Sequence, residues 1–161
     1  MDYLIATHHV EPQAIVSIRD RRKQDDLPGF LKASIPSLLS RLRLLGVVPS
    51  GPPFVIYHDF GAQGIDAEVS VPISEPIAAT GKVESRVLPA MTVAWTVHQG
   101  PYQNIAEAYT ALWNWVRSHG FQVAGPVQER YLIGPGERVA PSQYRTEIEM
   151  PIVPVVVVAP V

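Results

Sequence analysis

The sequence predicts an α+β domain in which two pseudo-twofold βαββ repeats form one antiparallel sheet, with the helices on one face and a ligand groove on the other. Three observations predict this fold. Segments of the two halves match in the same order. Each half has the pattern strand, helix, strand, strand. The chain has 161 residues, 47% of them hydrophobic, which is enough for one compact core.

The two halves match at nearly constant spacing. Residues 46–58 match residues 120–132 at a spacing of 74, and residues 67–73 match residues 146–152 at a spacing of 79. The matched pairs are Gly46 and Gly120, Gly51-Pro52 and Gly125-Pro126, Tyr57 and Tyr131, Glu68 and Glu147, and Pro72 and Pro151. Two copies are too few for a solenoid, so the matches predict a single pseudo-symmetric domain. It divides into repeat one (about 10–73), a linker (74–89), repeat two (about 90–152) and a tail (153–161).

Repeat one begins with a predicted strand at 14–19. A helix follows, because leucines recur at helical spacing, and Gly46 ends it. The leucines of this stripe are Leu31, Leu38, Leu42 and Leu45. Pro36 lies inside the helix and predicts a kink or a start as late as Ser34. Strands are predicted near 54–59 and 66–72, and the linker could partly extend a strand.

Repeat two has the same order. The segment M-T-V-A-W-T-V-H at 91–98 is rich in β-formers and predicts a strand, and G-P-Y at 100–102 turns the chain. A helix follows as far as His119, and Gly120 occupies the position of a helix-ending glycine. The helical stripe consists of Ile105, Tyr109, Leu112 and Val116, with Trp113 beside it. Strands are predicted near 127–133 and 144–150.

Composition excludes several classes of function. The net charge is −2 with 13 Lys and Arg, so no nucleic-acid surface is expected. The basic segment R-D-R-R-K at 19–23 is interpreted as a solvated strand end or loop. The absence of cysteine excludes disulfides and fits a reducing cytoplasm, where we place the protein. No signal peptide or membrane span is visible. The five histidines lack metal-site spacing, so we expect neither a metal nor a cofactor.

Strand alternation suggests where charge gathers. In 144–150, Ile148 and Met150 should face the helices, while Glu147 and Glu149 face away. In the predicted strand 66–72, the same alternation places Glu68 on the face that points away from the helices. No predicted element covers this face, so it is the predicted functional surface. The pattern leaves open whether Glu147 is a solvated carboxylate paired with Arg130 or Arg145, or part of the wall of a cavity. Glu149 is expected at the rim or in solvent. The pattern alone does not decide on which side Tyr57 and Tyr131 lie.

The motif V-H-Q-G-P-Y-Q-N-I-A-E-A-Y at 97–109, followed by T-E-I-E-M-P-I at 146–152, resembles the GyrI-like small-molecule-binding domain family. The resemblance extends over roughly 10–152 and agrees with the doubled βαββ order. It implies a groove between the two halves, lined with aromatic residues and closed by one carboxylate, which maps onto Glu147. Many members are effector-binding domains of multidrug-sensing regulators and bind lipophilic cations. No helix-turn-helix precedes the domain in this sequence, so a stand-alone member is expected.

The resemblance implies a first function, the binding of flat, hydrophobic, often cationic or electrophilic small molecules. Charge pairing and stacking on aromatic faces would hold such a ligand. The ligand-binding residues expected are Glu147, Glu68, Tyr57, Tyr131, Trp95, Tyr109 and Trp113, although the last three equally fit a core position. A small molecule is the expected partner, with no nucleic acid and no membrane, and an oligomer is allowed.

Two alternatives remain open at this point. Some stand-alone members are similar to hydrolases that open the cyclopropane ring of DNA-alkylating natural products. In that case Glu147 would act as general base, and Tyr131 or Tyr57 would stabilise the oxygen that gains negative charge. Others protect DNA gyrase, which would make the protein an interaction module.

Overall fold

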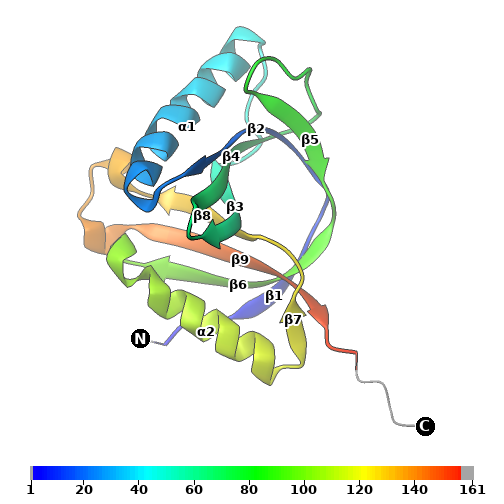
Figure 1. Cartoon of the computed structure of the whole chain (residues 1–161), viewed down its shortest axis with the longest axis vertical. Coiled ribbons are helices and arrows are strands. Elements are labelled where there is room, and N and C mark those ends of the chain that lie inside the picture. Colours follow the sequence, from blue (N-terminus) through cyan, green and yellow to red (C-terminus); the bar gives the residue numbers. More distant parts are fainter. Residues whose placement is uncertain (1, 157–161) are drawn as a thin grey trace.

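The computed structural model describes residues 2–156 and confirms an α+β fold with a nine-stranded antiparallel sheet and two helices (Figure 1). The strands are β1 (Ala6–Val10), β2 (Gln13–Arg22), β3 (Phe54–Gly61), β4 (Gly64–Ile73), β5 (Glu84–Leu88), β6 (Met91–Gln99), β7 (Phe121–Val123), β8 (Val127–Ile133) and β9 (Arg145–Pro154). The helices are α1 (Leu27–Leu44) and α2 (Ile105–Ser118).

The strand order reflects the pseudo-symmetry. The sheet runs β1-β6-β9-β8-β3-β4-β2-β5, and β7 pairs with β9 at the side. Strands β6, β9 and β8 of repeat two therefore mirror β2, β4 and β3 of repeat one. Strands β3 and β8 meet in the middle of the sheet through the pairs Phe54–Arg130 to Tyr57–Val127. The pseudo-twofold axis accordingly lies between these two strands.

The helices repeat the symmetry at the level of single residues. The buried stripe of α1 contains Ser34, Leu38 and Leu42, and that of α2 contains Ala108, Leu112 and Val116, each pair again 74 residues apart. Both helices give way to a glycine with positive φ, Gly46 at 70° and Gly120 at 78°. Only glycine adopts this conformation without a steric penalty, which explains why both helices stop at the same place.

Two details of repeat one differ from the prediction. The helix α1 begins at Leu27, well before Ser34, and continues through Pro36. Phe30 extends its buried stripe toward the N-terminus, and this burial offsets the backbone hydrogen bond that Pro36 cannot make. At the other end, Leu45 is 53% exposed because the helix has already ended.

The sheet has a helix face, on which α1 and α2 pack, and an opposite face that we call the open face. The core lies on the helix face, where Val16, Val69 and Val71 pack with α1, and Ile148 and Met150 pack with α2. The open face carries a smaller apolar cluster of Ile15, Phe54 and Ile56. Period-two alternation in each strand thus separates one large core from a second, more polar surface.

The open face is not left uncovered, contrary to the prediction. Strand β1 was not predicted, and β5 lies in the linker, which was expected to extend a strand in part. Strand β1 pairs with β6, and β5 pairs with β2, in one continuous register from Ala6–Trp95 to Ser17–Glu84. We call the two paired segments, residues 6–17 and 84–95, the ribbon. It arches beside the sheet (Figure 1), and residues from its middle line a cleft together with residues of β3 and β8.

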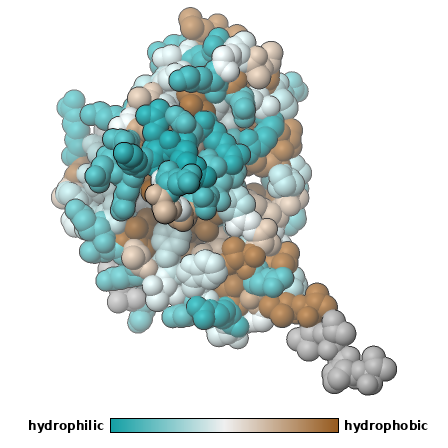
Figure 2. All heavy atoms as spheres, viewed as in Figure 1, coloured by the Kyte–Doolittle hydropathy of each residue, from teal (hydrophilic) through white to brown (hydrophobic). Residues whose placement is uncertain are grey.

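The basic segment at 19–23 lies at the end of β2, as predicted, and carries ion pairs. Arg19 bonds Asp66 at 2.8 Å, Arg21 bonds Asp59 at 3.1 Å, and Arg22 bonds Asp20 at 2.9 Å. In Figure 2, hydrophilic residues cover the middle of the view, whereas hydrophobic residues gather near the end of β9. The positive charges are matched locally by acidic partners.

The chain beyond β9 is described only to residue 156. Val155 donates its backbone N–H to Gly120 at 2.9 Å, so the tail begins beside β7. The other residues of the predicted valine-rich tail, 157–161, lie outside the described residues. Within residues 2–156 neither helix is long and apolar enough to span a membrane.

Candidate functional site

A buried carboxylate surrounded by tyrosines lies on the helix face where the two repeats meet. Glu129 of β8 is 8% exposed. It accepts a short hydrogen bond from the Tyr109 hydroxyl of α2 and a second, at 3.1 Å, from the Tyr131 hydroxyl of β8. The Tyr131 hydroxyl also bonds that of Tyr57 on β3 at 2.8 Å. We call these four residues the tyrosine–glutamate cluster.

Local sequence explains how β8 presents two members of the cluster to one face. Val127, Glu129 and Tyr131 alternate with Gln128 and Arg130, so they share the helix face. Register confirms this, since Glu129 pairs with Val55 and with Ile148, both of which are core residues of the helix face. Tyr57 lies across from Val127 on the same side.

More aromatic rings border the cluster. Tyr102, from the G-P-Y turn, meets Tyr131 edge-on with ring centroids 6.0 Å apart. It also stacks on Tyr144 at 5.3 Å, and Phe60 stacks on Tyr57 at the same separation. Tyr102 is 37% exposed, so the aromatic group extends from the buried carboxylate toward the surface.

Burial dominates the electrostatics of the cluster. Desolvation raises the pKa of Glu129, although hydrogen bonds from Tyr109 and Tyr131 and the charge of His98 act in the opposite direction. Desolvation and the nearby Glu129 charge also raise the pKa of Tyr131 and of Tyr109. The hydroxyls are therefore neutral donors, and among the described residues no ion pair with Lys or Arg neutralises Glu129.

The structure does not bring Glu147 to the predicted tyrosines. Glu147 pairs with Arg130 and Val97 on the open face, whereas Tyr57, Tyr109 and Tyr131 lie on the helix face. A general base at Glu147 and an oxygen stabiliser at Tyr131 would therefore act on opposite sides of the sheet. Glu147 lies on the open face, as strand alternation predicts, whereas Tyr57 and Tyr131 project from their strands to the helix face.

The position of Glu149 also differs from the prediction. It was predicted at the rim or in solvent, yet it is 7% exposed. Arg130 bonds its Oε1 at 2.9 Å, while its Oε2 has no hydrogen-bond partner among the described residues. Desolvation and the adjoining Glu147 raise the pKa of Glu149 to about 7, against the opposing charge of Arg130. Glu149 pairs in register with Trp95 of β6 and Gln128 of β8, and its partner Arg130 comes from β8, so the local sequence could not show this environment.

Glu68 lies on the open face, as the alternation predicts, but it is fully buried. Two of the three Arg86 guanidinium nitrogens donate to its carboxylate, Ser17 donates to it at 2.6 Å, and His58 Nε2 lies 2.8 Å away. Burial alone would raise the pKa of Glu68, but these hydrogen bonds outweigh it and lower the pKa. Three strand spacings, about 14 Å, separate Glu68 on β4 from Glu147 on β9.

The two tryptophans predicted as ligand contacts lie apart from the cluster. Trp95 is on the open face of β6 and stacks on His8 with ring centroids 4.8 Å apart. Trp113 of α2 is 43% exposed, since it lies beside the buried stripe rather than in it. Of the predicted aromatic residues, Tyr57, Tyr109 and Tyr131 are the ones that gather around a carboxylate.

Glu129 was not among the predicted site residues, although the repeat contains a signal for it. At the spacing of 74 that aligns Tyr57 with Tyr131, Glu129 aligns with Val55, which is fully buried. A carboxylate that replaces a core valine in a pseudo-symmetric copy is costly unless it has a function or a partner. Tyr109 likewise aligns with Ile35, so repeat two supplies most of the polar groups.

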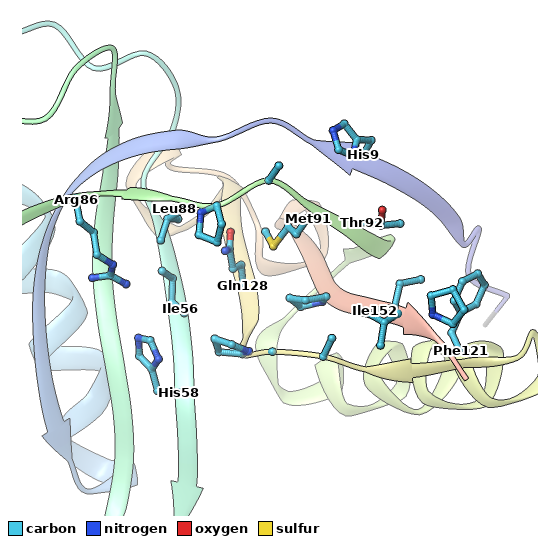
Figure 3. Close-up of a pocket in the computed structure, with 18 residues that line it drawn as sticks. His9, Ile56, His58, Arg86, Leu88, Met91, Thr92, Phe121, Gln128 and Ile152 are labelled. Carbon is cyan, nitrogen blue, oxygen red and sulfur yellow. The ribbon is translucent and has the colours of Figure 1, made fainter. Parts of the chain in front are cut away.

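A separate cleft of about 670 Å³ lies on the open face, between the ribbon and strands β3, β8 and β9 (Figure 3). Arg86 and His58 lie at one end and Phe121 and Ile152 at the other, with Gln128 between them. Groups of three or more His, Asp or Glu able to hold a metal are absent from residues 2–156.

A family comparison agrees with the fold and with both sequence motifs. The model of the GyrI-like small molecule binding domain matches residues 8–153. The chain belongs to this family. No curated protein matches the chain in sequence.

Solved structures show how widely this GyrI-like fold occurs. The EcmrR C-terminal domain is 24% identical, with a TM-score of 0.86 over 96% of this chain and 100% of that one. Compared with the full EcmrR chain seen in an EcmrR–DNA complex, this chain spans 58% of the length of EcmrR. SAV2435 bound to tetraphenylphosphonium is 16% identical, with a TM-score of 0.65 over 95% of this chain and 94% of that one. A Listeria innocua hydrolase is 12% identical, with a TM-score of 0.69 over 92% of this chain and 91% of that one. At these identities the likenesses establish the fold.

Proposed function

We propose that this GyrI-like protein binds flat, hydrophobic, cationic small molecules at the tyrosine–glutamate cluster, with Glu129 as counter-ion. One observation carries the proposal: Glu129 is buried, and its partners are tyrosine hydroxyls rather than a Lys or Arg. A buried carboxylate without a cation is costly, and a cationic ligand would remove that cost. The aromatic rings add cation–π contacts.

The position of the cluster supports the same proposal. It lies where the two repeats meet on the helix face, and the partly exposed Tyr102 borders it. Flat rings and one charge recognise shape and charge class rather than a single compound, which favours broad specificity. Binding of tetraphenylphosphonium by SAV2435, a protein of the same fold, makes this cation a suitable probe.

The test compares Glu129→Gln with Glu147→Gln in calorimetric titrations with tetraphenylphosphonium. Loss of the buried counter-ion should weaken binding by about tenfold or more, as expected for a charged contact. Glu147→Gln changes a carboxylate on the opposite face and should bind as the wild type does. Equal binding by Glu129→Gln and wild type, or a selective loss in Glu147→Gln, would refute the assignment.

A second candidate is hydrolysis at the same cluster. It is favoured by the hydrogen bonds that join the Tyr57 hydroxyl to the Tyr131 hydroxyl and the Tyr131 hydroxyl to Glu129. In this reaction Glu129 takes a proton from water as the water oxygen attacks a cyclopropane carbon. The ring C–C bond breaks, and the electron pair passes to the conjugated carbonyl oxygen, to which a tyrosine hydroxyl donates a hydrogen bond.

Mass spectrometry of a cyclopropane-containing alkylator incubated with the protein tests this candidate. Turnover predicts a product heavier by one water, which Glu129→Gln abolishes and Tyr131→Phe slows. Binding of the compound by the wild type without any water-added product would remove hydrolysis of this substrate class and leave the binding function.

A further inference from the structure

We propose that the open-face cleft is a second binding site, selective for small amphipathic anions that carry an apolar body and one carboxylate, sulfonate or similar group. This inference does not depend on the proposed function, because the two sites share no side chain. In β3 and β8, His58 and Gln128 turn to the cleft, while their chain neighbours Tyr57 and Glu129 turn to the helix face. The two sites lie back to back across the centre of the sheet.

The size and lining of the cleft suit a small molecule. Its volume of about 670 Å³ lies within the range of about 300–1,000 Å³ that is usual for small-molecule sites. Apolar side chains dominate its walls, among them Ile56, Leu88, Met91, Phe121 and Ile152. The ribbon supplies one wall and the centre of the sheet the other (Figure 3), so an apolar body would be enclosed from two sides.

Charge gives the cleft its selectivity. Arg86, His58 and His9 are among its described lining residues, and Asp and Glu are absent from that set. The tyrosine–glutamate cluster has the reverse composition, an acid with tyrosines around it. The two faces of the sheet therefore favour ligands of opposite charge.

Arg86 is the group that would hold the anion. Two of its guanidinium nitrogens bond the fully buried Glu68, which fixes the orientation of the side chain. A guanidinium has five N–H donors, so three remain after these two bonds. The side chain is 39% exposed and lines the cleft. A guanidinium held in place in this way is preorganised for a carboxylate or sulfonate oxygen.

The arrangement along the cleft orients the ligand. Arg86 and His58 lie at one end and Phe121 and Ile152 at the opposite end (Figure 3). An anionic head at Arg86 would extend an apolar body past Leu88 and Gln128 toward Phe121. Among the described residues Glu68 has Ser17, His58 and Arg86 as partners, so hydrogen-bonding groups surround its carboxylate beneath the site.

Fluorescence titration with 8-anilinonaphthalene-1-sulfonate tests the site, because the probe is an aromatic anion that brightens in apolar surroundings. Arg86→Gln alone removes the guanidinium from the buried Glu68 and could unfold the protein, so the decisive variant is Glu68→Gln/Arg86→Gln, in which both charges are removed. We expect this pair to fold and to bind the probe about tenfold more weakly, or less tightly still. Glu68→Gln alone frees the guanidinium and should bind at least as tightly as the wild type.

Two controls locate the probe and test its charge. Ala124→Trp fills the cleft from an exposed lining position and should reduce binding, whereas Glu129→Gln on the other face should not. Dodecanoate should displace the probe at lower concentration than dodecylammonium, a cation of equal chain length. Unchanged binding in both the double variant and Ala124→Trp would overturn the proposal. So would a loss confined to Glu129→Gln, or equal displacement by the two competitors.

Discussion

The two repeats place carboxylates at equivalent positions on the open face but surround them differently. In repeat one Glu68 is fully buried and has Arg86, Ser17 and His58 as partners, and its pKa is lowered. In repeat two, Arg130 bonds Glu149, and the adjoining Glu147 and desolvation raise the pKa of Glu149 to about 7. Both Glu68 and Glu149 are removed from solvent. The difference shows that local charge balance, rather than burial alone, decides the direction of a pKa shift.

Breaking the ion pair of repeat one should have the largest effect. Arg86→Met leaves Glu68 a buried charge with only Ser17 and His58 as partners. We expect a loss of about 3 kcal/mol in the free energy of unfolding, at the lower end for broken buried pairs because Arg86 is partly exposed. Urea denaturation at neutral pH measures it. Glu68→Gln/Arg86→Met removes both charges and should recover most of the stability. Wild-type stability in Arg86→Met would contradict the account of Glu68.

The carboxyls of repeat two should make the protein less stable as the pH rises. This is opposite in sign to the effect of Glu68, whose pKa is lowered. Between pH 4.5, the ordinary value for Glu149, and about 7, the native state keeps a proton that the unfolded state has lost. Stability from this group is therefore complete below pH 4.5 and falls as pH rises to 7. Thermal unfolding of Glu149→Gln across this range should show a shallower decline than the wild type.

Two matched variants sharpen that measurement. Glu147→Gln removes the neighbouring negative charge, so the decline should move to lower pH rather than vanish. Glu129 also has a raised pKa and should account for the decline that remains in Glu149→Gln. A profile for Glu149→Gln that coincides with the wild type would mean that Glu149 ionises normally in the folded protein.

The smallest effect is expected where an ion pair is exposed. Arg21 and Asp59 are 40% and 55% exposed, so water and salt screen their attraction. Arg21→Ala should cost less than about 1 kcal/mol, and the cost should shrink further at high salt. Chemical denaturation at low and high salt checks this. A loss as large as that of Arg86→Met would break the contrast between buried and exposed pairs.

Much of the fold was predictable because its signals are local. Helical stripes, strand alternation and the glycines at 46 and 120 each depend on residues close in sequence. Strands β1 and β7 were missed because A-T-H-H-V carries little apolar alternation and F-Q-V is only three residues long. The early start of α1 was missed because Pro36 suggested an interruption that the buried Phe30 and Leu38 prevent.

The structure brings three of the predicted aromatic residues together, and which carboxylate binds a ligand stays a prediction. An aromatic group around one glutamate was expected, and Tyr57, Tyr109 and Tyr131 form such a group, but around Glu129 instead of Glu147. The motif at 146–152 drew attention to Glu147, whereas a comparison of Val55 with Glu129 across the repeat would have indicated the buried carboxylate.

By itself, the sequence determined the doubled βαββ order, the helix ends and the set of residues that share a face within each strand, since these depend on chain periodicity. The tertiary structure decided which faces meet. Pairing of β3 with β8 brought Tyr57 to Tyr131, packing of α2 brought Tyr109 to Glu129, and the ribbon brought Arg86 to Glu68. These contacts join residues far apart in the chain, and the burial that sets their pKa values exists only once the strands and helices have packed together.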